Sequence, residues 1–537
     1  MTIASDVLEQ RFETSDFGAR KPFGAHAALS LVVLALGAYA QASDEASDTG
    51  VAFAFPVLCS LVLAYAALQV LLVRRHHHEL WLVNPAVQSA IFLHLLPTTS
   101  ALVLPFLPEE LQTGVGFDPF SDQWAVRYEW LNLVGVVALW TGYWSGVAHW
   151  IARAIASSTL LHRMIRPGLS LNVGAALALV LVSSGFRLLT IRLGLYGYSA
   201  SPERRELAEA YSQYLAMAGD LGKVVLVAVS LATFEGRIRK WPMVALLIME
   251  TVFGVLSGFK SAVLVPFVIV GLSAYSIRGR LPAILLPSIG AGIFVAYALI
   301  QPFREARFKE FEFDETSVSS IVDTFVASRD SAYAQSEPDG PVAKTTASFF
   351  VRVSDVATAA NGIEFAERWE VLPEGSPDFL KDILLSPLYS VVPRLVWEGK
   401  PINDVGVWYT QVVMGEGTTS STAMYPVTYL NFAGGIIAVV LGFLLVGVIQ
   451  SALFRGISAH RGASLFLAVC LIGSLGHVDS VYYSFFISLI RNLPILFGLQ
   501  WLLFRRGEDG SRDVGSARDD AVLGDESSEQ AVTPEVA

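Results

Sequence analysis

Residues that could hold a charged group gather in one polar stretch, SVVPRLVWEGKPINDVG, at 390–406. Two cations, Arg394 and Lys400, stand close to Trp397 and Asp404, and two prolines constrain the backbone beside them. An arginine guanidinium donates two parallel hydrogen bonds, which suits carboxylate and phosphate oxygens. The stretch therefore predicts a site for an anionic group. Trp397 is either a membrane-interface anchor or a stacking platform for the ligand.

Several carboxylates predicted at the outer side of the membrane could accept a proton from a reacting hydroxyl group. They are Asp355, Glu398, Asp404 and Asp479, and the last stands beside His477 in the run GHVDS. No spacing selects one of them as a base. Solvated loop acids are the simpler interpretation of each.

The elements that must position these residues are membrane-spanning helices. Only 16% of the residues are charged, whereas a soluble domain carries about 25%. A window of about 19 residues predicts roughly twelve spans of the length that a bilayer requires. They lie near 23–41, 51–73, 85–107, 127–150, 169–190, 212–233, 241–258, 261–277, 281–300, 431–453, 462–478 and 481–504. The predicted fold class is an all-α polytopic integral membrane protein.

Positive charge predicts the orientation, because cytoplasmic gaps carry an excess of Lys and Arg. Both termini are therefore expected to be cytoplasmic, and Gly258–Phe259–Lys260 is expected to be a tight turn on the outer side. An alternative for the start is a cleavable signal peptide ending near AYAQA (38–42), which leaves the later topology unchanged. The basic gaps are every second one: 74–78, 153–166, 237–240, 278–280, 455–461 and 505–506.

This topology divides the chain into four parts. Residues 1–300 carry nine spans, 301–430 form one large extracytoplasmic loop, 431–506 carry three spans, and 507–537 are an acidic cytoplasmic tail expected to be disordered. Within the loop, the apolar spacing predicts a helix at 346–369. The segment 379–397, broken at Pro387 and Pro393, is expected to be interfacial or re-entrant.

Arginines predicted at the outer side could bind the same anion as the polar stretch. They are Arg187, Arg192, Arg352 and Arg491. An arginine at mid-bilayer costs about 2.5–3.5 kcal/mol on insertion scales, so Arg187 and Arg491 are expected to have a function there. The alternatives are snorkelling to the headgroups and a structural ion pair. Glu250 and His94 are further intramembrane polar groups, and we expect each to be packed and hydrogen-bonded.

Two motifs resemble the O-antigen polymerase (Wzy-type) family of oligosaccharide repeat-unit polymerases. VPRLVWEGKP (392–401) followed by YPVTYLNFAGG (425–435) looks like that family's large periplasmic loop and next span, and LSGFKSAVLVP (256–266) is similar to its turn between two spans. The sequence departs from the family pattern at Thr428, where an acid is expected, and at Ala433, where a glycine is expected.

The resemblance implies a GT-C-like membrane glycosyltransferase that joins polyprenyl-diphosphate-linked oligosaccharides outside the cytoplasm, with membrane lipids, a chain-length regulator and a flippase as partners. A diphosphate leaving group needs cations and the acceptor hydroxyl needs a proton acceptor, so we expect Arg394, Lys400, Arg352 and Asp355 to be catalytic. We expect five further residues to bind the substrate: Arg187, Arg192, Arg491, Trp397 and Asp404.

No motif for a nucleotide, a metal or nucleic acid is present, so we expect no cofactor and no metal. HHH at 76–78 is interpreted as part of a positively charged segment that sets the membrane orientation, and not as a metal-binding sequence. A transporter or flippase for a lipid-linked glycan or another anion remains the alternative. The absence of evident internal repeats favours the enzyme.

Overall fold

The computed structural model describes twelve main segments of the chain. They are 21–44, 48–77, 80–106, 119–166, 168–197, 202–281, 356–369, 371–392, 405–415, 424–458, 463–476 and 482–505, with a few isolated residues between 283 and 422. The described residues form helices joined by turns, with one isolated β-bridge, between Leu171 and Phe504, and no strand. Most of the predicted span 281–300, and the whole acidic tail, lie outside the described residues.

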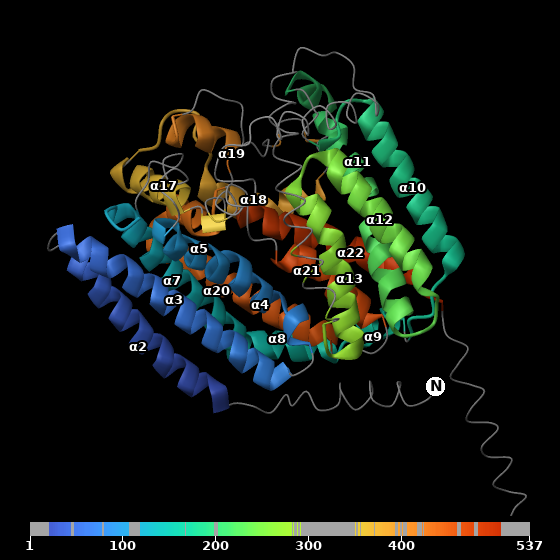
Figure 1. The fold of residues 1–537 in the computed structure, drawn as a ribbon, viewed down its shortest axis with the longest axis horizontal. Coiled ribbons are helices and arrows are strands. Elements are labelled where there is room, and N and C mark those ends of the chain that lie inside the picture. Colours follow the sequence, from blue (N-terminus) through green and yellow to red (C-terminus); the bar gives the residue numbers. More distant parts are fainter. Residues whose placement is uncertain are drawn as a thin grey trace, which may run out of the picture.

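The helices follow one another from α2 to α22 (Figure 1). In the first half they are α2 (Lys21–Asp44), α3 (Asp48–His77), η1 (Trp81–Val83), α4 (Pro85–Ser89), the π-helix η2 (Ala90–Leu95), α5 (Leu96–Val103), η3 (Leu104–Phe106), α7 (Gln123–Trp144), α8 (Gly146–Ala156), α9 (Thr159–Met164), α10 (Val173–Arg192), α11 (Pro202–Phe234), α12 (Lys240–Ser257) and α13 (Lys260–Arg278). In the second half they are α17 (Val356–Arg368), α18 (Phe379–Val391), α19 (Val405–Trp408), the π-helix η5 (Tyr409–Val413), α20 (Pro426–Ser458), α21 (Ser464–Gly476) and α22 (Tyr482–Leu503).

The chain is an all-α membrane protein. Within the described residues, nine helical segments are long and apolar enough to cross a membrane, and each coincides with a predicted span. A tenth predicted span, 127–150, is bent by 45° between α7 and α8. The eleventh, at 462–478, is represented by the 13-residue α21, which is shorter than the roughly 20 residues that a bilayer needs.

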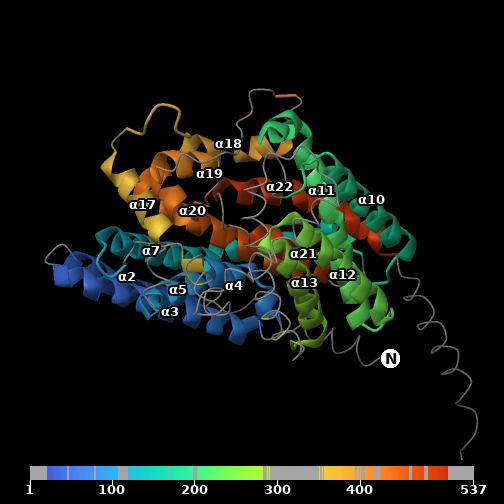
Figure 2. The same cartoon turned by 45° about the horizontal axis from the view of Figure 1, so that its top comes forward.

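Two groups of helices lie side by side (Figures 1 and 2). The first contains α2, α3, α7, α8 and α20, and the second contains α10 to α13. α21 and α22 contact members of both groups, and α18 packs along α22. α17, α18 and α19 lie beyond one end of the bundle (Figure 2), which is the end predicted to face outward.

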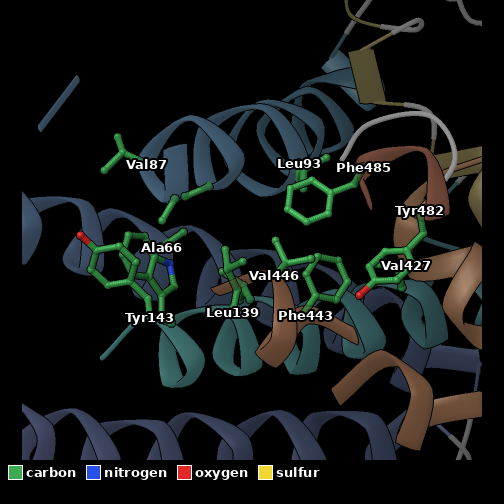
Figure 3. Close-up of a cluster of buried hydrophobic side chains, with 14 of the residues drawn as sticks. Ala66, Val87, Leu93, Leu139, Tyr143, Val427, Phe443, Val446, Tyr482 and Phe485 are labelled. Carbon is green, nitrogen blue, oxygen red and sulfur yellow. The ribbon is translucent and has the colours of Figure 1, made fainter. Parts of the chain in front are cut away.

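The centre of the first group is the interface of α7 with α20 (Figure 3). Leu139 and Tyr143 of α7 are fully buried there with Phe443 and Val446 of α20. Lipid tails are as apolar as these side chains, so helix association inside a membrane rests on close packing rather than on removal of apolar surface from water.

Two of the predicted spans are present but irregular. The predicted span 127–150 is not one straight helix, because Ser145 interrupts it with an extended backbone and caps α8. The predicted span 431–453 belongs to a helix that begins at Pro426 and breaks at Gly434 and Gly435. Gly435 has a φ of 62° and a ψ of −153°, a conformation that only glycine adopts readily.

Pro387 was expected to break the loop segment 379–397, and that prediction was wrong. Pro387 lies inside α18. Proline lacks the N–H that would bond to the carbonyl four residues earlier, here that of Ile383. The Ser386 hydroxyl donates to this carbonyl at 2.7 Å and replaces the missing bond.

The described parts of the basic segments used to predict orientation lie at one end of the bundle, the lower edge in Figure 1. Arg166 stacks on Trp501 of α22 at 4.5 Å, and Arg278 of α13 stacks on Phe234 of α11 at 4.8 Å. Arg455 of α20 lies 5.2 Å from the ring of Trp144 of α7. We call this end the basic face.

Candidate functional site

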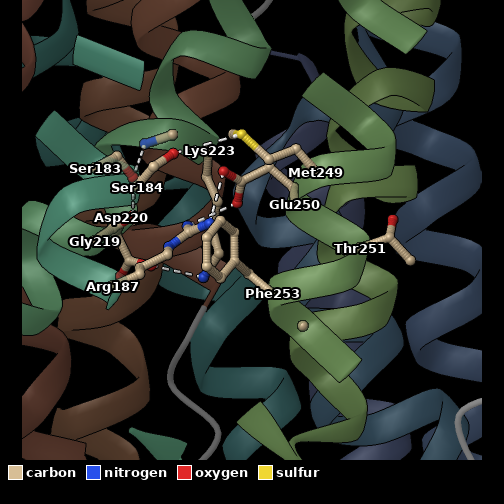
Figure 4. A network of polar contacts seen from close by, with 12 residues as sticks. Ser183, Ser184, Arg187, Gly219, Asp220, Lys223, Met249, Glu250, Thr251 and Phe253 are labelled. Carbon is tan, nitrogen blue, oxygen red and sulfur yellow. Dashed lines mark hydrogen bonds and ion pairs between the residues drawn. The ribbon is translucent and has the colours of Figure 1, made fainter. Parts of the chain in front are cut away.

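A buried ion pair joins α10 to α12 (Figure 4). Both of its residues lie in the half of their helix away from the basic face. Nη1 of Arg187 donates to Oε1 of Glu250 at 2.9 Å, and Nη2 donates to Oε2 at 2.7 Å. The side chains are only 6% and 1% exposed. The guanidinium also lies 4.9 Å from the ring of Phe253. Arg187 thus forms the structural ion pair that the sequence left as an alternative to binding an anion, and Glu250 is hydrogen-bonded as predicted.

α11 leaves space for the ion pair because the residue facing it, Gly222, has no side chain. A Cβ atom at Gly222 would lie 2.1 Å from Oε1 of Glu250. The hydroxyl of Ser183 on α10 donates to the Gly219 carbonyl at 2.5 Å and accepts from the Gly222 N–H at 3.1 Å. These contacts fix α10, α11 and α12 around the pair.

The ion pair forms one wall of a pocket of about 230 Å³ between α10, α11, α12 and the start of α13. A second, more exposed pair lies on the α11 side, where Nζ of Lys223 is 2.7 Å from Oδ1 of Asp220. Their side chains are 30% and 59% exposed. The pocket thus contains two cations and two carboxylates, and these charges sum to zero.

Tyr196 adds a neutral donor to the pocket. Its hydroxyl donates to the Phe253 carbonyl at 2.9 Å. Burial, as the largest effect, raises the pKa of Tyr196 to about 12. The phenol therefore stays protonated at any physiological pH and cannot serve as a base there.

The structure does not bring the other predicted arginines into this pocket. Arg192 is exposed at the last turn of α10. Arg491 lies on α22, close enough to Tyr214 of α11 for an electrostatic interaction. Its Nε atom is buried without a hydrogen-bond partner among the described residues.

Lys400 caps the C-terminal end of the loop helix α18, and Trp397 packs beside it. Nζ of Lys400 donates to the carbonyls of Tyr389 and Val392 at 2.6 and 3.2 Å. A cation at this position complements the negative end of the helix dipole. The ring of Trp397 lies 5.6 Å from that of Tyr389. The other predicted residues of the loop and of GHVDS lie outside the described residues, namely Arg352, Asp355, Arg394, Glu398, Asp404, His477 and Asp479.

A second buried polar network lies between α7 and the irregular helix η2–α5. Nδ1 of His94 is 2.6 Å from Oδ1 of Asn132, whose Nδ2 donates to Oε2 of Glu129 at 3.1 Å. Thr98 also contacts this carboxylate, at 3.4 Å. His94 is therefore packed and hydrogen-bonded, as predicted. All four side chains are fully buried, and none of them lines the pocket beside Arg187 and Glu250.

Sequence reasoning missed Asp220, Lys223 and Glu129. A signal was present for each, because an ionisable side chain inside an apolar span is rare and tends to be functional or paired. Asp220 and Lys223 interrupt the predicted span 212–233 at a spacing of three residues, which places them on one helix face. In the described residues no group of three His, Cys, Asp or Glu side chains could hold a metal ion.

The chain matches the profile of one protein family over residues 189–476, which is more than half of its length. That family is described as Domain of unknown function (DUF8712), and the chain belongs to it. The matched region contains the pocket residues from Thr190 onward, and Arg187 lies just before it. No curated protein and no solved structure matches the chain.

Proposed function

We propose that this member of the DUF8712 family is a polymerase that joins polyprenyl-diphosphate-linked oligosaccharide repeat units. It acts at the outer face of the cytoplasmic membrane as a twelve-span, GT-C-like glycosyltransferase with both termini in the cytoplasm. The observation that carries the proposal is the pocket formed by α10 to α13, because it combines two cations with two carboxylates at the end of the bundle away from the basic face.

Such a pocket suits a donor that is both anionic and lipid-linked. The pocket lies among helices that can cross a membrane, so a polyprenyl chain would remain in lipid while its diphosphate reached the charged residues. Lys223 is the cation better able to meet that diphosphate, because it is 30% exposed and its partner Asp220 is 59% exposed. Arg187 has both terminal nitrogens committed to Glu250.

The reaction then follows from an exchange of partners. Diphosphate oxygens bind Lys223 and release Asp220, whose carboxylate accepts the proton of the acceptor hydroxyl. The acceptor oxygen forms a bond to the anomeric carbon of the donor glycan. The bond from that carbon to the phosphate oxygen breaks, and polyprenyl diphosphate leaves with the electron pair. Lys223 stabilises the charge that develops on the leaving group.

Arg187 and Glu250 position the pocket wall in this mechanism. Their bidentate contact fixes α10 against α12, and Ser183 links the same wall to α11. Arg394 stays a sequence-based candidate for a second phosphate contact, because its guanidinium stands beside two prolines in the polar stretch and suits phosphate oxygens.

The decisive experiment is reconstitution of the purified protein with lipid-linked oligosaccharide. A polymerase gives a ladder of longer glycans, and Asp220→Asn and Lys223→Gln abolish the ladder while leaving the protein folded. A matched control is Arg237→Gln, which removes an exposed cation on the basic face that is paired with Glu235. Transbilayer movement of the substrate without elongation would contradict the polymerase.

One observation favours the second candidate function, transport of a lipid-linked glycan. α20 is interrupted at Gly434 and Gly435, and discontinuous helices form the substrate sites of many transporters. The same reconstitution separates the two functions, since a transporter moves the oligosaccharide between leaflets and leaves its length unchanged.

A further inference from the structure

A second charged site lies at the basic face, remote from the pocket. It consists of Arg75 and His76 at the end of α3, His149 and Arg153 on α8, and Arg455 on α20. The charges of Arg455 and Arg153 both act on His149, and those of Arg455 and Arg75 both act on His76. We call these five residues the basic cluster.

Arg455 is the residue whose bonding is incomplete. Its Nη1 contacts Nε2 of His149, and its guanidinium lies 5.0 and 5.2 Å from the rings of Tyr143 and Trp144. Its Nε and Nη2 atoms are buried without a hydrogen-bond partner among the described residues. A buried cation is normally paired with an anion or fully hydrogen-bonded.

The neighbouring histidine does not neutralise this charge. Nδ1 of His149 lies 2.9 Å from the Ser145 carbonyl, which can only accept a hydrogen bond. Nδ1 therefore carries the proton, and Nε2 is the atom that accepts from Arg455. The ring is neutral in this arrangement, and no carboxylate of the described residues forms an ion pair with Arg455.

The basic cluster lies where the bundle would meet a lipid surface. α8 is bent by 45° from α7 and buries Ala148 and Ala152, while Val147 and Trp150 are 58% and 66% exposed. A short helix with one buried face and an exposed tryptophan is typical of the membrane interface. Lipid phosphates lie at this depth, and basic pockets at the ends of spanning helices bind anionic headgroups.

We propose that the basic cluster binds the phosphate of an anionic phospholipid, with Arg455 as its central contact and Arg153 and Arg75 at its rim. The exposed Val147 and Trp150 favour a lipid over free phosphate, because these apolar side chains beside the cluster would meet acyl chains. The proposal concerns the opposite end of the bundle from the pocket and does not depend on the reaction proposed for it.

The test is native mass spectrometry of the full-length protein in detergent. It is titrated with phosphatidylglycerol or with phosphatidylcholine of the same acyl chains. The wild type should bind phosphatidylglycerol more tightly. Arg455→Gln should weaken that binding about tenfold or more, the usual effect of losing hydrogen bonds to a charged group. Arg455→Lys, which keeps the charge but loses the planar fork, should fall between the two.

Two further variants keep the test decisive if Arg455→Gln fails to fold. Arg153→Gln changes an exposed residue of the cluster and should weaken phosphatidylglycerol binding a few-fold. Arg163→Gln removes an exposed cation from α9 outside the cluster. It should change the affinity for phosphatidylglycerol by no more than about twofold relative to the wild type. If both variants lost phosphatidylglycerol affinity equally, the lipid would be responding to overall surface charge and not to a specific site. That result would overturn the proposal.

Two other results would also overturn it. One is equal affinity for the two lipids in the wild type. The other is inorganic phosphate alone competing with phosphatidylglycerol at similar concentrations, which would assign the cluster to a soluble anion.

Discussion

The Arg187–Glu250 pair should behave as a coupled unit when either residue is replaced. Arg187→Met leaves a carboxylate without its partner, and Glu250→Met leaves a guanidinium without its partner. Both side chains are almost fully enclosed, at 6% and 1% exposure. Removing one partner of a buried pair typically costs about 3–5 kcal/mol, because the remaining charge stays buried.

The double variant, with methionine at both positions, should be more stable than either single variant. No buried charge remains in it, and replacing both partners by apolar residues of similar volume is often neutral. Each single variant should therefore lower the folding equilibrium constant by roughly two to four orders of magnitude. The double variant should recover most of that loss.

The assay is equilibrium unfolding of the purified protein in mixed micelles, followed by tryptophan fluorescence. The matched control is Arg237→Met, which breaks the exposed Arg237–Glu235 pair. Exposed pairs contribute about 0–1 kcal/mol, so this variant should unfold nearly as the wild type does. Losses that simply add in the double variant would refute the coupling, and unchanged stability in both single variants would refute the burial argument.

Three further predictions test the site, the topology and the resemblance. Gly222→Ala places a Cβ atom 2.1 Å from Oε1 of Glu250; it should destabilise the protein by about 1–3 kcal/mol in the same unfolding assay, the usual effect of overpacking. A cysteine in place of Ser336 should react with an impermeant thiol reagent added to intact cells, and one in place of His77 should not; labelling at position 77 would contradict the twelve-span topology. Arg394→Ala should slow glycan elongation roughly a hundredfold or more at normal abundance, and Arg394→Lys should be nearly as harmful; normal polymer from Arg394→Ala would remove this residue from the proposed site.

The sequence predicted the helices better than it predicted their irregularities. Nine predicted spans coincide with long apolar helices because hydropathy over a window measures what a bilayer selects. The turn at Gly258 was also predicted correctly, and the residue there has a φ of 70°. The bend at Ser145 and the break at Gly435 change backbone direction without changing hydropathy, so a hydropathy window cannot detect either one.

The site was predictable in its parts and not in its assembly. Arg187 and Glu250 were each identified from the sequence, because placing an ionisable side chain inside a membrane costs free energy. Their pairing spans 63 residues of sequence and depends on how α10 packs against α12. Gly222 permits that packing only because it lacks a side chain, and a single glycine in an apolar span carries no distinctive signal.

The difference in exposure between the two ion pairs decides which carboxylate an incoming anion can displace. Coulomb attraction at about 4 Å amounts to about 1 kcal/mol in water and about 4 kcal/mol near a protein surface, and it grows as water is excluded. Asp220, at 59% exposure, therefore holds Lys223 weakly, whereas Glu250, at 1% exposure, holds Arg187 through two hydrogen bonds. Asp220 can also be solvated once it is displaced, and Glu250 cannot. An anionic substrate should accordingly exchange with Asp220 and leave the Arg187–Glu250 pair intact. If that is so, Asp220→Asn should tighten binding of a non-reactive lipid diphosphate while abolishing elongation, because the competing charge and the proton acceptor are the same group. Weaker binding by Asp220→Asn would show that the carboxylate holds the substrate rather than competing with it, and the exchange mechanism would fail.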